Sequence, residues 1–296
     1  MLFWETLLRL KPEIDKTLDE LFDVVKSNQQ NEQDLLLIII NGFYEKSLEK
    51  NGKLSPFVFG TGGWSYYADS DQYFFYDSYR GTINETPRDK YFKDYDENDK
   101  KQAEYRFLLH IELMVYLKFW ESEQTLKRLY QLSRLAQNKS YDWQFLLTKD
   151  DSRHELIREK IRDGIKNVCP KYYKLLKDIY LSQIRNAAAH SQFYILYQSL
   201  GFTNYNPKNA PLTQEKFIDW EDRFHKLILL QDGILKRLNV NHKEYVDKQV
   251  DKEFGLEIRA TFKGHTRKNT FLKYVTTGSR PDWMWYDNWK KNHKYK

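Results

Sequence analysis

The sequence lacks the features that mark secreted and membrane proteins. It contains one cysteine, Cys169, in 296 residues, which excludes an intramolecular disulfide and suggests a reducing compartment. Its longest apolar run, residues 35–40, is far too short to span a membrane. Residues 1–10 include Glu5 and show neither a basic leader nor a small-residue cleavage site. We therefore expect a cytoplasmic protein with no membrane partner.

The signatures of several enzyme classes are absent as well. The sequence has no Gly-x-Ser-x-Gly turn, and it has no set of Cys, His and carboxylate residues with convincing metal-ligand spacing, although His154-Glu155 and His110-x-Glu112 occur. Residues 60–63, Gly-Thr-Gly-Gly, are not followed by Lys-Ser/Thr, which favours a turn over a phosphate-binding loop. We expect no metal and no cofactor.

The positive charge is concentrated in the C-terminal part of the chain. From Lys252 onward eleven basic residues stand against four acidic ones, whereas residues 1–251 have 37 basic and 38 acidic residues. Basic residues alternate with aromatic ones in this tail, which suits phosphate contact and base stacking. Its candidate RNA-binding residues are Arg267, Lys268, Lys290 and Lys291. The alternative is that the tryptophans only pin the tail to the body of the protein.

The apolar pattern predicts a mainly α fold. Two helices are expected over 12–27 and 31–50, and an aromatic and Gly-rich insertion of β or irregular structure over 55–87. Further helices are expected over 101–121, 123–138, 152–167, 170–200 and 213–239. No segment between residues 101 and 240 alternates like a strand, so this part reads as an antiparallel helical bundle.

Changes in composition divide the chain into three parts. Residues 1–97 contain the first helices and the insertion, 98–250 the bundle, and 251–296 a basic, irregular extension. The charged run over 88–101 makes the first boundary credible.

One predicted helix contains an Arg and a His five residues apart. The sequence Ile184-Arg185-Asn186-Ala187-Ala188-Ala189-His190 lies between Pro170 and Gly201, which are typical residues at the start and just past the end of a helix. The same spacing type occurs over 237–242 and 259–265, but these segments cross turn-prone residues or a glycine. Residues 184–190 are therefore the best candidate for a rigid site.

Helix geometry separates Arg185 from His190. Five residues turn about 500°, so the two side chains diverge by about 140° on one helix. The three alanines between them leave room for a second helix or a second copy of the chain. A composite site at a two-fold interface would bring such groups together.

Residues 184–190 resemble the motif of the HEPN superfamily, which is Arg-x4-6-His with a polar residue directly after the Arg, on a helix of an all-α bundle. The resemblance covers about half the chain, residues 98–240. It implies a homodimer or pseudo-dimer that brings two such motifs together, and in many members metal-independent endoribonuclease activity, as in toxins, abortive-infection proteins and RNA-targeting CRISPR effectors. An antitoxin or a phage-derived trigger is then an expected regulator. Other members do not cleave, and bind RNA, nucleotide or a partner protein as regulators or scaffolds.

The residue types suit this chemistry. Attack of a ribose 2′-hydroxyl on its 3′-phosphate needs a base, an acid and positive charge, and leaves a 2′,3′-cyclic phosphate. His190 is expected as base or acid, Arg185 on the phosphorane oxygens, and Asn186 as the group that orients the imidazole or the phosphate. Glu112, inside an apolar helix face, is the expected buried partner of Arg185 or of another base.

Two plainer interpretations stand beside this one. An Arg and a His on one helix are most often a salt-bridged surface residue and a satisfied core residue. Alternatively, the bundle only dimerises, and the basic aromatic tail binds nucleic acid.

Overall fold

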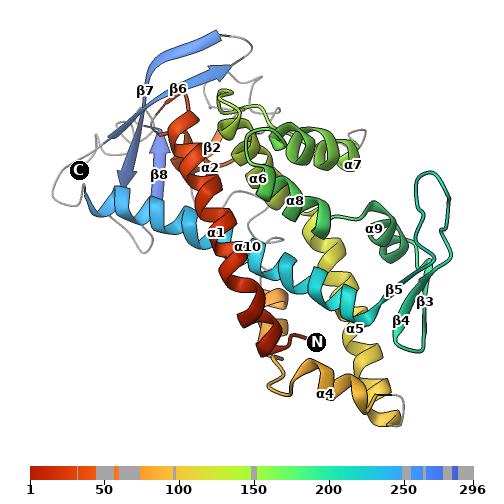
Figure 1. The fold of residues 1–296 in the computed structure, drawn as a ribbon. Coiled ribbons are helices and arrows are strands. Elements are labelled where there is room, and N and C mark those ends of the chain that lie inside the picture. The colour runs from red at the N-terminus through yellow and green to blue at the C-terminus, as the bar shows by residue number, and fades with distance from the viewer. Residues whose placement is uncertain are drawn as a thin grey trace.

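The structure, a computed structural model, describes residues 1–31, 33–44, 57–59, 74–95, 98–147, 152–248, 255–262, 265–275 and 282–285. The fold is mainly helical, with small antiparallel sheets. Figure 1 shows long helices crossing one another in the middle of the molecule, with one three-stranded sheet near each end of the last long helix. The prediction of a mainly α fold is confirmed.

The N-terminal helix is longer than expected. Helix α1 (Trp4–Asn28) contains Pro12 within its length and packs against α6 (Glu123–Ala136), α8 (Pro170–Ile179) and α10 (Phe217–Asp247). Its buried residues recur at helical spacing from Leu10 to Val25. Figure 1 shows α1 crossing α10 near the middle of the molecule, where the two helices pack against each other.

The second predicted helix, over 31–50, is wrong at residues 41–44, and its last six residues lie outside the described part of the chain. Helix α2 (Asp34–Ile40) ends at Ile40, and strand β1 (Asn41–Tyr44) pairs with β2 (Phe57–Phe59) in an antiparallel ladder. The ammonium group of buried Lys127 donates to the carbonyls of Asn41, at 2.5 Å, and Gly42, at 3.0 Å. This side chain from α6 satisfies carbonyls at the helix end that an ongoing helix would have used. Within the 55–87 insertion, residues 57–59 form a strand as expected, but residues 74–80 are helical.

The central helices agree with the sequence. After α4 (Arg88–Lys93), α5 (Asp99–Glu121) starts at Asn98, whose side chain accepts from the Lys101 amide, and α6 starts at Ser122, whose hydroxyl accepts from the Thr125 amide. The predicted helical segment 152–167 consists of a short α7 (Arg153–Glu155), a π-helix (Leu156–Arg162) and a 3-10 turn (Asp163–Ile165).

The prediction of one helix over 170–200 is wrong. Helix α8 ends at Ile179, α9 (Ser182–Ala189) follows, and the chain then forms β3 (Phe193–Leu196) and β4 (Ser199–Phe202). Gly201 lies in β4, not after a helix. It pairs with Tyr194, whose ring occupies the space where a Cβ on Gly201 would lie.

A three-stranded sheet therefore interrupts the bundle, contrary to the expectation of no strand between 101 and 240. Its order is β3-β4-β5, with β5 (Gln214–Lys216) running directly into α10. Helix α10 begins at Phe217 and ends at Asp247, so it extends past the predicted residue 239. On one face of the sheet Ile195 and Leu200 pair, and Leu200 and Phe202 are buried. The other face carries Tyr194 and Leu196, both half-exposed.

The described residues of the C-terminal extension form strands, where the sequence predicted irregular structure. Strands β6 (Gly255–Phe262), β7 (His265–Val275) and β8 (Asp282–Trp285) form an antiparallel sheet in the order β6-β7-β8. Trp283 is buried, and its indole N–H donates to His242 Nε2 on α10 at 2.9 Å. This contact fits the view that a tryptophan pins the tail to the body.

The core runs from the N-terminal residues to α10 as one continuous cluster of buried side chains. Its largest fully buried members are mostly aromatic and include Trp120, Trp220, Tyr105, Tyr116 and Phe224. The phenol and indole groups bring hydrogen-bond donors into the core, so buried acceptors are needed among them. Glu112 and Glu221, both fully buried, supply such acceptors.

Candidate functional site

The candidate motif lies on α9, and a buried tyrosine of α5 sets where that helix begins. The Tyr116 hydroxyl donates to the Ile179 carbonyl at 2.9 Å and accepts from the Leu181 amide at 2.9 Å. Inserted in this way, it replaces the backbone bonds that would have continued α8, and Tyr180 and Leu181 take extended backbone angles. The chain bends here and α9 starts afresh at Ser182.

Helix α9 ends immediately after the motif. Ser191 has a φ of 54°, in the left-handed region, and the Gln192 amide donates to the Ala187 carbonyl at 2.9 Å. This is the bond pattern of a Schellman helix end, with serine in the position that glycine usually takes. The His190 amide donates to the Asn186 carbonyl at 3.0 Å, which places His190 as the last, capping residue of the helix.

One side of α9 is anchored in the protein. Ile184 and Ala187 are buried, and α9 packs against α5. Gln183 is buried too, and its amide group bonds both the carbonyl and the amide of Leu212 at 2.7 and 2.9 Å. Helix α5 is thus a neighbouring helix of the segment that carries the alanine run, and Ala187 of this run is buried.

Arg185 is held by two neighbours. Its guanidinium donates to Asn186 Oδ1 at 2.8 Å and forms an ion pair with Glu121, the last residue of α5. The other Glu121 oxygen lies 3.3 Å from Arg153 Nε, so one carboxylate bridges two arginines. The Arg185 side chain keeps 25% of its surface exposed. It is therefore oriented in part by the polar residue that follows it in the motif.

The structure places His190 on the surface. Its side chain forms no hydrogen bond or ion pair with any residue in the described part of the chain, and the residue is exposed. We expected Asn186 on the same side of the helix as His190. Its side chain instead accepts a hydrogen bond from Arg185, and its only bond to His190 is through its backbone carbonyl. The imidazole is thus accessible, and Asn186 does not orient it here.

Glu112 is not the partner of Arg185, and that expectation is wrong. It is fully buried, accepts from the Tyr79 hydroxyl and the Trp220 indole at 2.6 Å each, and contacts the backbone nitrogen of Met1. Glu121, at the exposed end of the same helix, takes the role instead. The apolar pattern around Glu112 correctly indicated burial, but it could not reveal which donors meet there.

Sequence reasoning missed a second histidine beside Arg185. His154 Nδ1 lies 3.1 Å from the Tyr180 hydroxyl, at the bend before α9. Partial burial lowers the pKa of His154, and the charges of Arg158, Arg162 and Arg185 lower it further. Burial also raises the pKa of Tyr180 to about 12. The neutral imidazole at neutral pH is the form that a general base needs.

The positively charged residues near His154 come from a π-helix. Arg158 and Arg162 lie on it, each in an ion pair with the acidic residue that follows it, Glu159 at 2.8 Å and Asp163 at 2.6 Å. Such helices often occur at functional sites, because the wider turn changes which side chains share a face. No pattern in the sequence distinguishes this segment from an ordinary α-helix.

The candidate residues of the tail are not brought to α9 by any described contact. Arg267 and Lys268 lie in β7, in the C-terminal sheet, and Lys290 and Lys291 lie outside the described residues. In the described part of the chain, no three His, Cys, Asp or Glu side chains form a group that could hold a metal ion. None of the described helices combines the length and apolar character that crossing a membrane requires.

Comparison of the chain with protein-family models, curated proteins and solved structures gives no match. The resemblance to the HEPN superfamily therefore rests on residues 184–190 and their helical setting, and it stays a prediction.

Proposed function

We propose that this chain is a HEPN-type, metal-independent endoribonuclease of a prokaryotic defence or toxin system. It cleaves RNA by attack of the ribose 2′-hydroxyl and leaves 2′,3′-cyclic phosphate ends. The observation that carries the proposal is the arrangement on α9, where Arg185 is oriented by Asn186 and Glu121 and His190 is exposed at the end of the same anchored helix. Both groups can be reached from solvent, as an RNA phosphate requires.

The roles follow from the chemistry of the side chains. Arg185 stabilises the negative charge of the phosphorane, since its planar guanidinium is permanently charged and can bond two oxygens at once. His190 transfers a proton, and a second imidazole is needed for the other transfer. The His190 of a second chain supplies it in a homodimer, in which two α9 helices meet. An antitoxin or a phage-derived trigger would control this assembly.

A second candidate function is a HEPN module that binds RNA, a nucleotide or a partner protein without cleaving. The ion pair between Arg185 and Glu121 favours it, because a carboxylate already occupies the guanidinium that should meet the phosphate. Arg153 shares that carboxylate, which leaves the pair of arginines with net positive charge for a bound anion.

Cleavage assays separate the two candidates. The full chain is incubated with mixed RNAs in EDTA, and the ends of the products are analysed for cyclic phosphate. We expect both Arg185→Ala and His190→Ala to lower cleavage by at least about a hundredfold, the scale of a general acid–base contribution. Retained cleavage in either variant contradicts the site.

A matched control for Arg185→Ala comes from another surface ion pair. Arg9→Ala removes an arginine from a half-exposed ion pair with Asp222. This variant should cleave like the wild type and should share its unfolding midpoint. A wild type that binds RNA but yields no cyclic phosphate establishes the binding module instead.

A further inference from the structure

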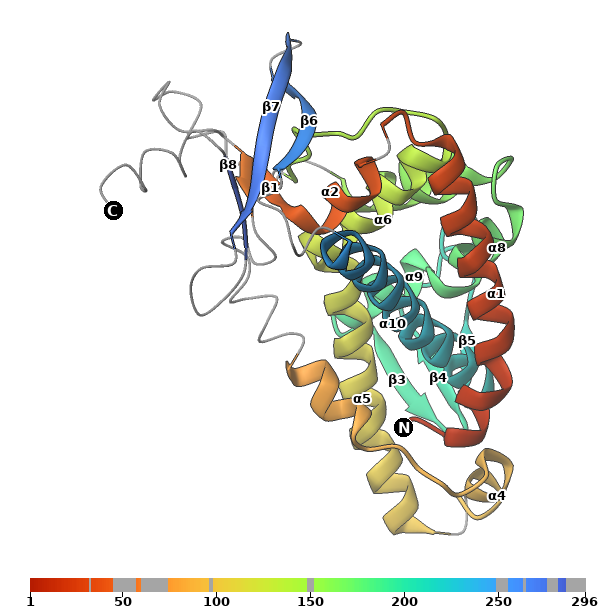
Figure 2. The same ribbon diagram turned by 90° about the vertical axis from the view of Figure 1, so that its left-hand side faces the viewer.

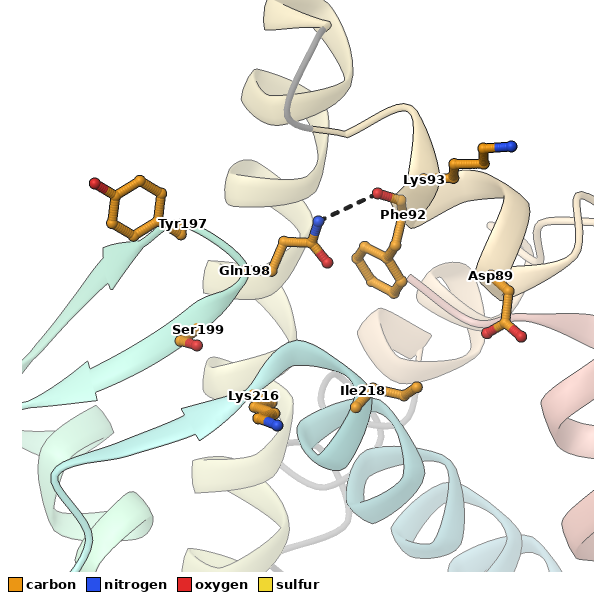
Figure 3. Close-up of a pocket in the computed structure, with 8 residues that line it drawn as sticks. All are labelled: Asp89, Phe92, Lys93, Tyr197, Gln198, Ser199, Lys216 and Ile218. Carbon is orange, nitrogen blue, oxygen red and sulfur yellow. Dashed lines mark hydrogen bonds between the residues drawn. The ribbon is translucent and has the colours of Figure 1, made fainter.

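A groove of about 550 Å³ lies where three elements meet, apart from the motif itself. Its walls come from α4, from the turn between β3 and β4, and from the junction of β5 with α10 (Figure 3). This volume falls in the range of small-molecule sites, about 300–1,000 Å³.

Hydrogen bonds fix the walls of this groove to one another. Gln198 Nε2 donates to the Phe92 carbonyl at 3.3 Å, which ties the hairpin turn to α4. The Phe217 amide donates to the Gln198 carbonyl at 2.9 Å, which ties the same turn to the start of α10. Because these bonds link three separate segments, the groove is a preformed feature of the fold.

An aromatic ring stands at the rim of the groove in an unusual backbone setting. Tyr197 has a φ of 50°, and its side chain is 78% exposed. A bulky residue in the left-handed region costs conformational energy that glycine or asparagine would avoid, and such strain gathers at functional positions. Figure 3 shows the ring standing away from the body of the protein, across the groove from α4. The two-residue hairpin turn between Leu196 and Ser199 accounts for the positive φ, whereas the exposure of the ring is explained if it stacks on a ligand.

The charge of the groove favours an anion. Lys93 and Lys216 line it, both exposed, and neither forms an ion pair with any residue that the structure describes. The acidic residue of the lining, Asp89, lies 3.8 Å from Arg88 Nε, which offsets part of its charge. An exposed ring and two unpaired ammonium groups around one groove are a combination that suits a base and a phosphate.

We propose that this groove binds one nucleotide, with its base stacked on Tyr197 and its phosphate on Lys216 and Lys93. The choice of a nucleotide over other aromatic anions rests on the proposed function. His190 lies three residues before β3 and Tyr197 directly after it, so the two are seven residues apart, a span of at most about 25 Å. The nucleotide is either free in solution or part of the RNA strand that reaches α9 along this strand of the sheet.

Binding is measured by titration calorimetry with the full chain. The probes are the four ribonucleoside monophosphates, inorganic phosphate, and a 12-nucleotide RNA with 2′-O-methyl groups, which cannot be cleaved by 2′-hydroxyl attack. Tyr197→Asn keeps a residue that tolerates the left-handed backbone but removes the ring. We expect it to weaken binding about 5- to 150-fold, the range for loss of one base–aromatic stack.

The lysines are tested with the double variant K93Q/K216Q. For the RNA probe, log affinity falls linearly with log salt concentration, and this slope should become shallower by roughly 0.7 for each lost phosphate contact. Lys208→Gln and Tyr205→Asn are matched controls, because both residues are exposed in the loop before β5 and neither lines the groove. Both should bind as the wild type does.

The probes also separate the two sources of the nucleotide. If a monophosphate binds and Tyr197→Asn weakens that binding, the ligand of the groove is a free nucleotide. If only the RNA binds in a Tyr197-dependent way, the ligand is a nucleotide of an RNA strand. Binding that is unchanged in Tyr197→Asn and in the double lysine variant, or binding of inorganic phosphate alone, overturns the inference. Because the 12-nucleotide probe cannot be cleaved, failure of the nuclease proposal on natural RNA leaves this result readable.

Discussion

Two neighbours hold the Arg185 side chain, and they act differently on its charge. Asn186 orients the guanidinium without neutralising it, whereas Glu121 neutralises part of it. Ion pairs with this degree of exposure contribute only about 0–1 kcal/mol, so an RNA phosphate can replace the carboxylate at small cost. Glu121 therefore keeps Arg185 in position in the free protein and can give way to substrate.

His225 is a buried histidine whose protonation should destabilise the fold. Its Nδ1–H donates to the Glu221 carbonyl at 2.6 Å, and its Nε2 accepts from the Phe3 amide at 2.8 Å. Burial lowers the pKa of His225 to about 3. The unfolded chain takes up the proton near pH 6.5, while the folded chain does not, so stability falls as the pH falls below that value.

We expect this residue to contribute up to about 1.4 kcal/mol per pH unit to the fall in unfolding free energy between about pH 6.5 and 4. Urea unfolding of the wild type and of His225→Asn at several pH values measures it. The variant should be less stable at pH 7 but should lose stability less steeply on acidification. Burial raises the pKa of Glu221, so this carboxyl group makes the folded state more stable as the pH falls. It does so in the wild type and in the variant alike. Parallel curves for the two would contradict the assignment.

At the scale of elements, the position of α9 depends on Tyr116. Its hydroxyl donates a hydrogen bond to the Ile179 carbonyl and accepts one from the Leu181 amide. Tyr116→Phe leaves both groups buried without that partner, and we expect a loss of roughly 2–5 kcal/mol in the free energy of unfolding. Cleavage should fall too, because α9 carries Arg185 and His190.

Tyr172→Phe is the matched control for this substitution. Tyr172 in α8 is equally buried, but its hydroxyl has no hydrogen-bond partner among the described residues. Removing it should be neutral or slightly stabilising. Urea unfolding of both variants gives the comparison, and equal losses would show that the bend does not depend on the Tyr116 hydroxyl.

The same contact explains what sequence reasoning could and could not predict. Helices α5, α6 and most of α10 follow from apolar spacing and from caps such as Ser122, which act locally. The end of α8 follows from a tyrosine more than sixty positions away, and the end of α9 follows from Ser191 in a conformation that glycine usually takes. Arg185 and His190 could be chosen from local signals. The ion pair of Arg185 with Glu121, the sharing of that carboxylate with Arg153, and the effect of the Arg185 charge on the pKa of His154 all depend on tertiary packing.

At the scale of the whole molecule, one core holds the long helices together and the two larger sheets lie toward opposite ends of α10 (Figures 1 and 2). The sheet β3-β4-β5 directly follows the candidate motif, and the sheet β6-β7-β8 follows α10. An RNA that contacts both α9 and β7 would therefore have to cross much of the protein. Variants in α9 therefore test the nuclease proposal, and variants in β7 separately test whether the tail contacts nucleic acid.

The proposed homodimer makes a quantitative prediction for mixed chains. If one active centre needs the motifs of both chains, a dimer that contains one inactive chain is inactive. When wild type and the double variant R185A/H190A are mixed in equal amounts and allowed to exchange, about one quarter of the dimers hold two wild-type chains. Cleavage should therefore fall to about a quarter of that given by the same total amount of wild type.

Chains that act independently would instead retain about half of the cleavage under these conditions, since half of the chains are intact. Sedimentation of the mixture checks that the proteins are dimers and that exchange is complete. The variant should fold like the wild type, because Arg185 and His190 lie outside the buried side of α9 that Ile184 and Ala187 form, and sedimentation of the variant alone checks that it still dimerises. A retained half, with dimers present, would mean that the two motifs work separately and that Arg185 and His190 of one chain act together.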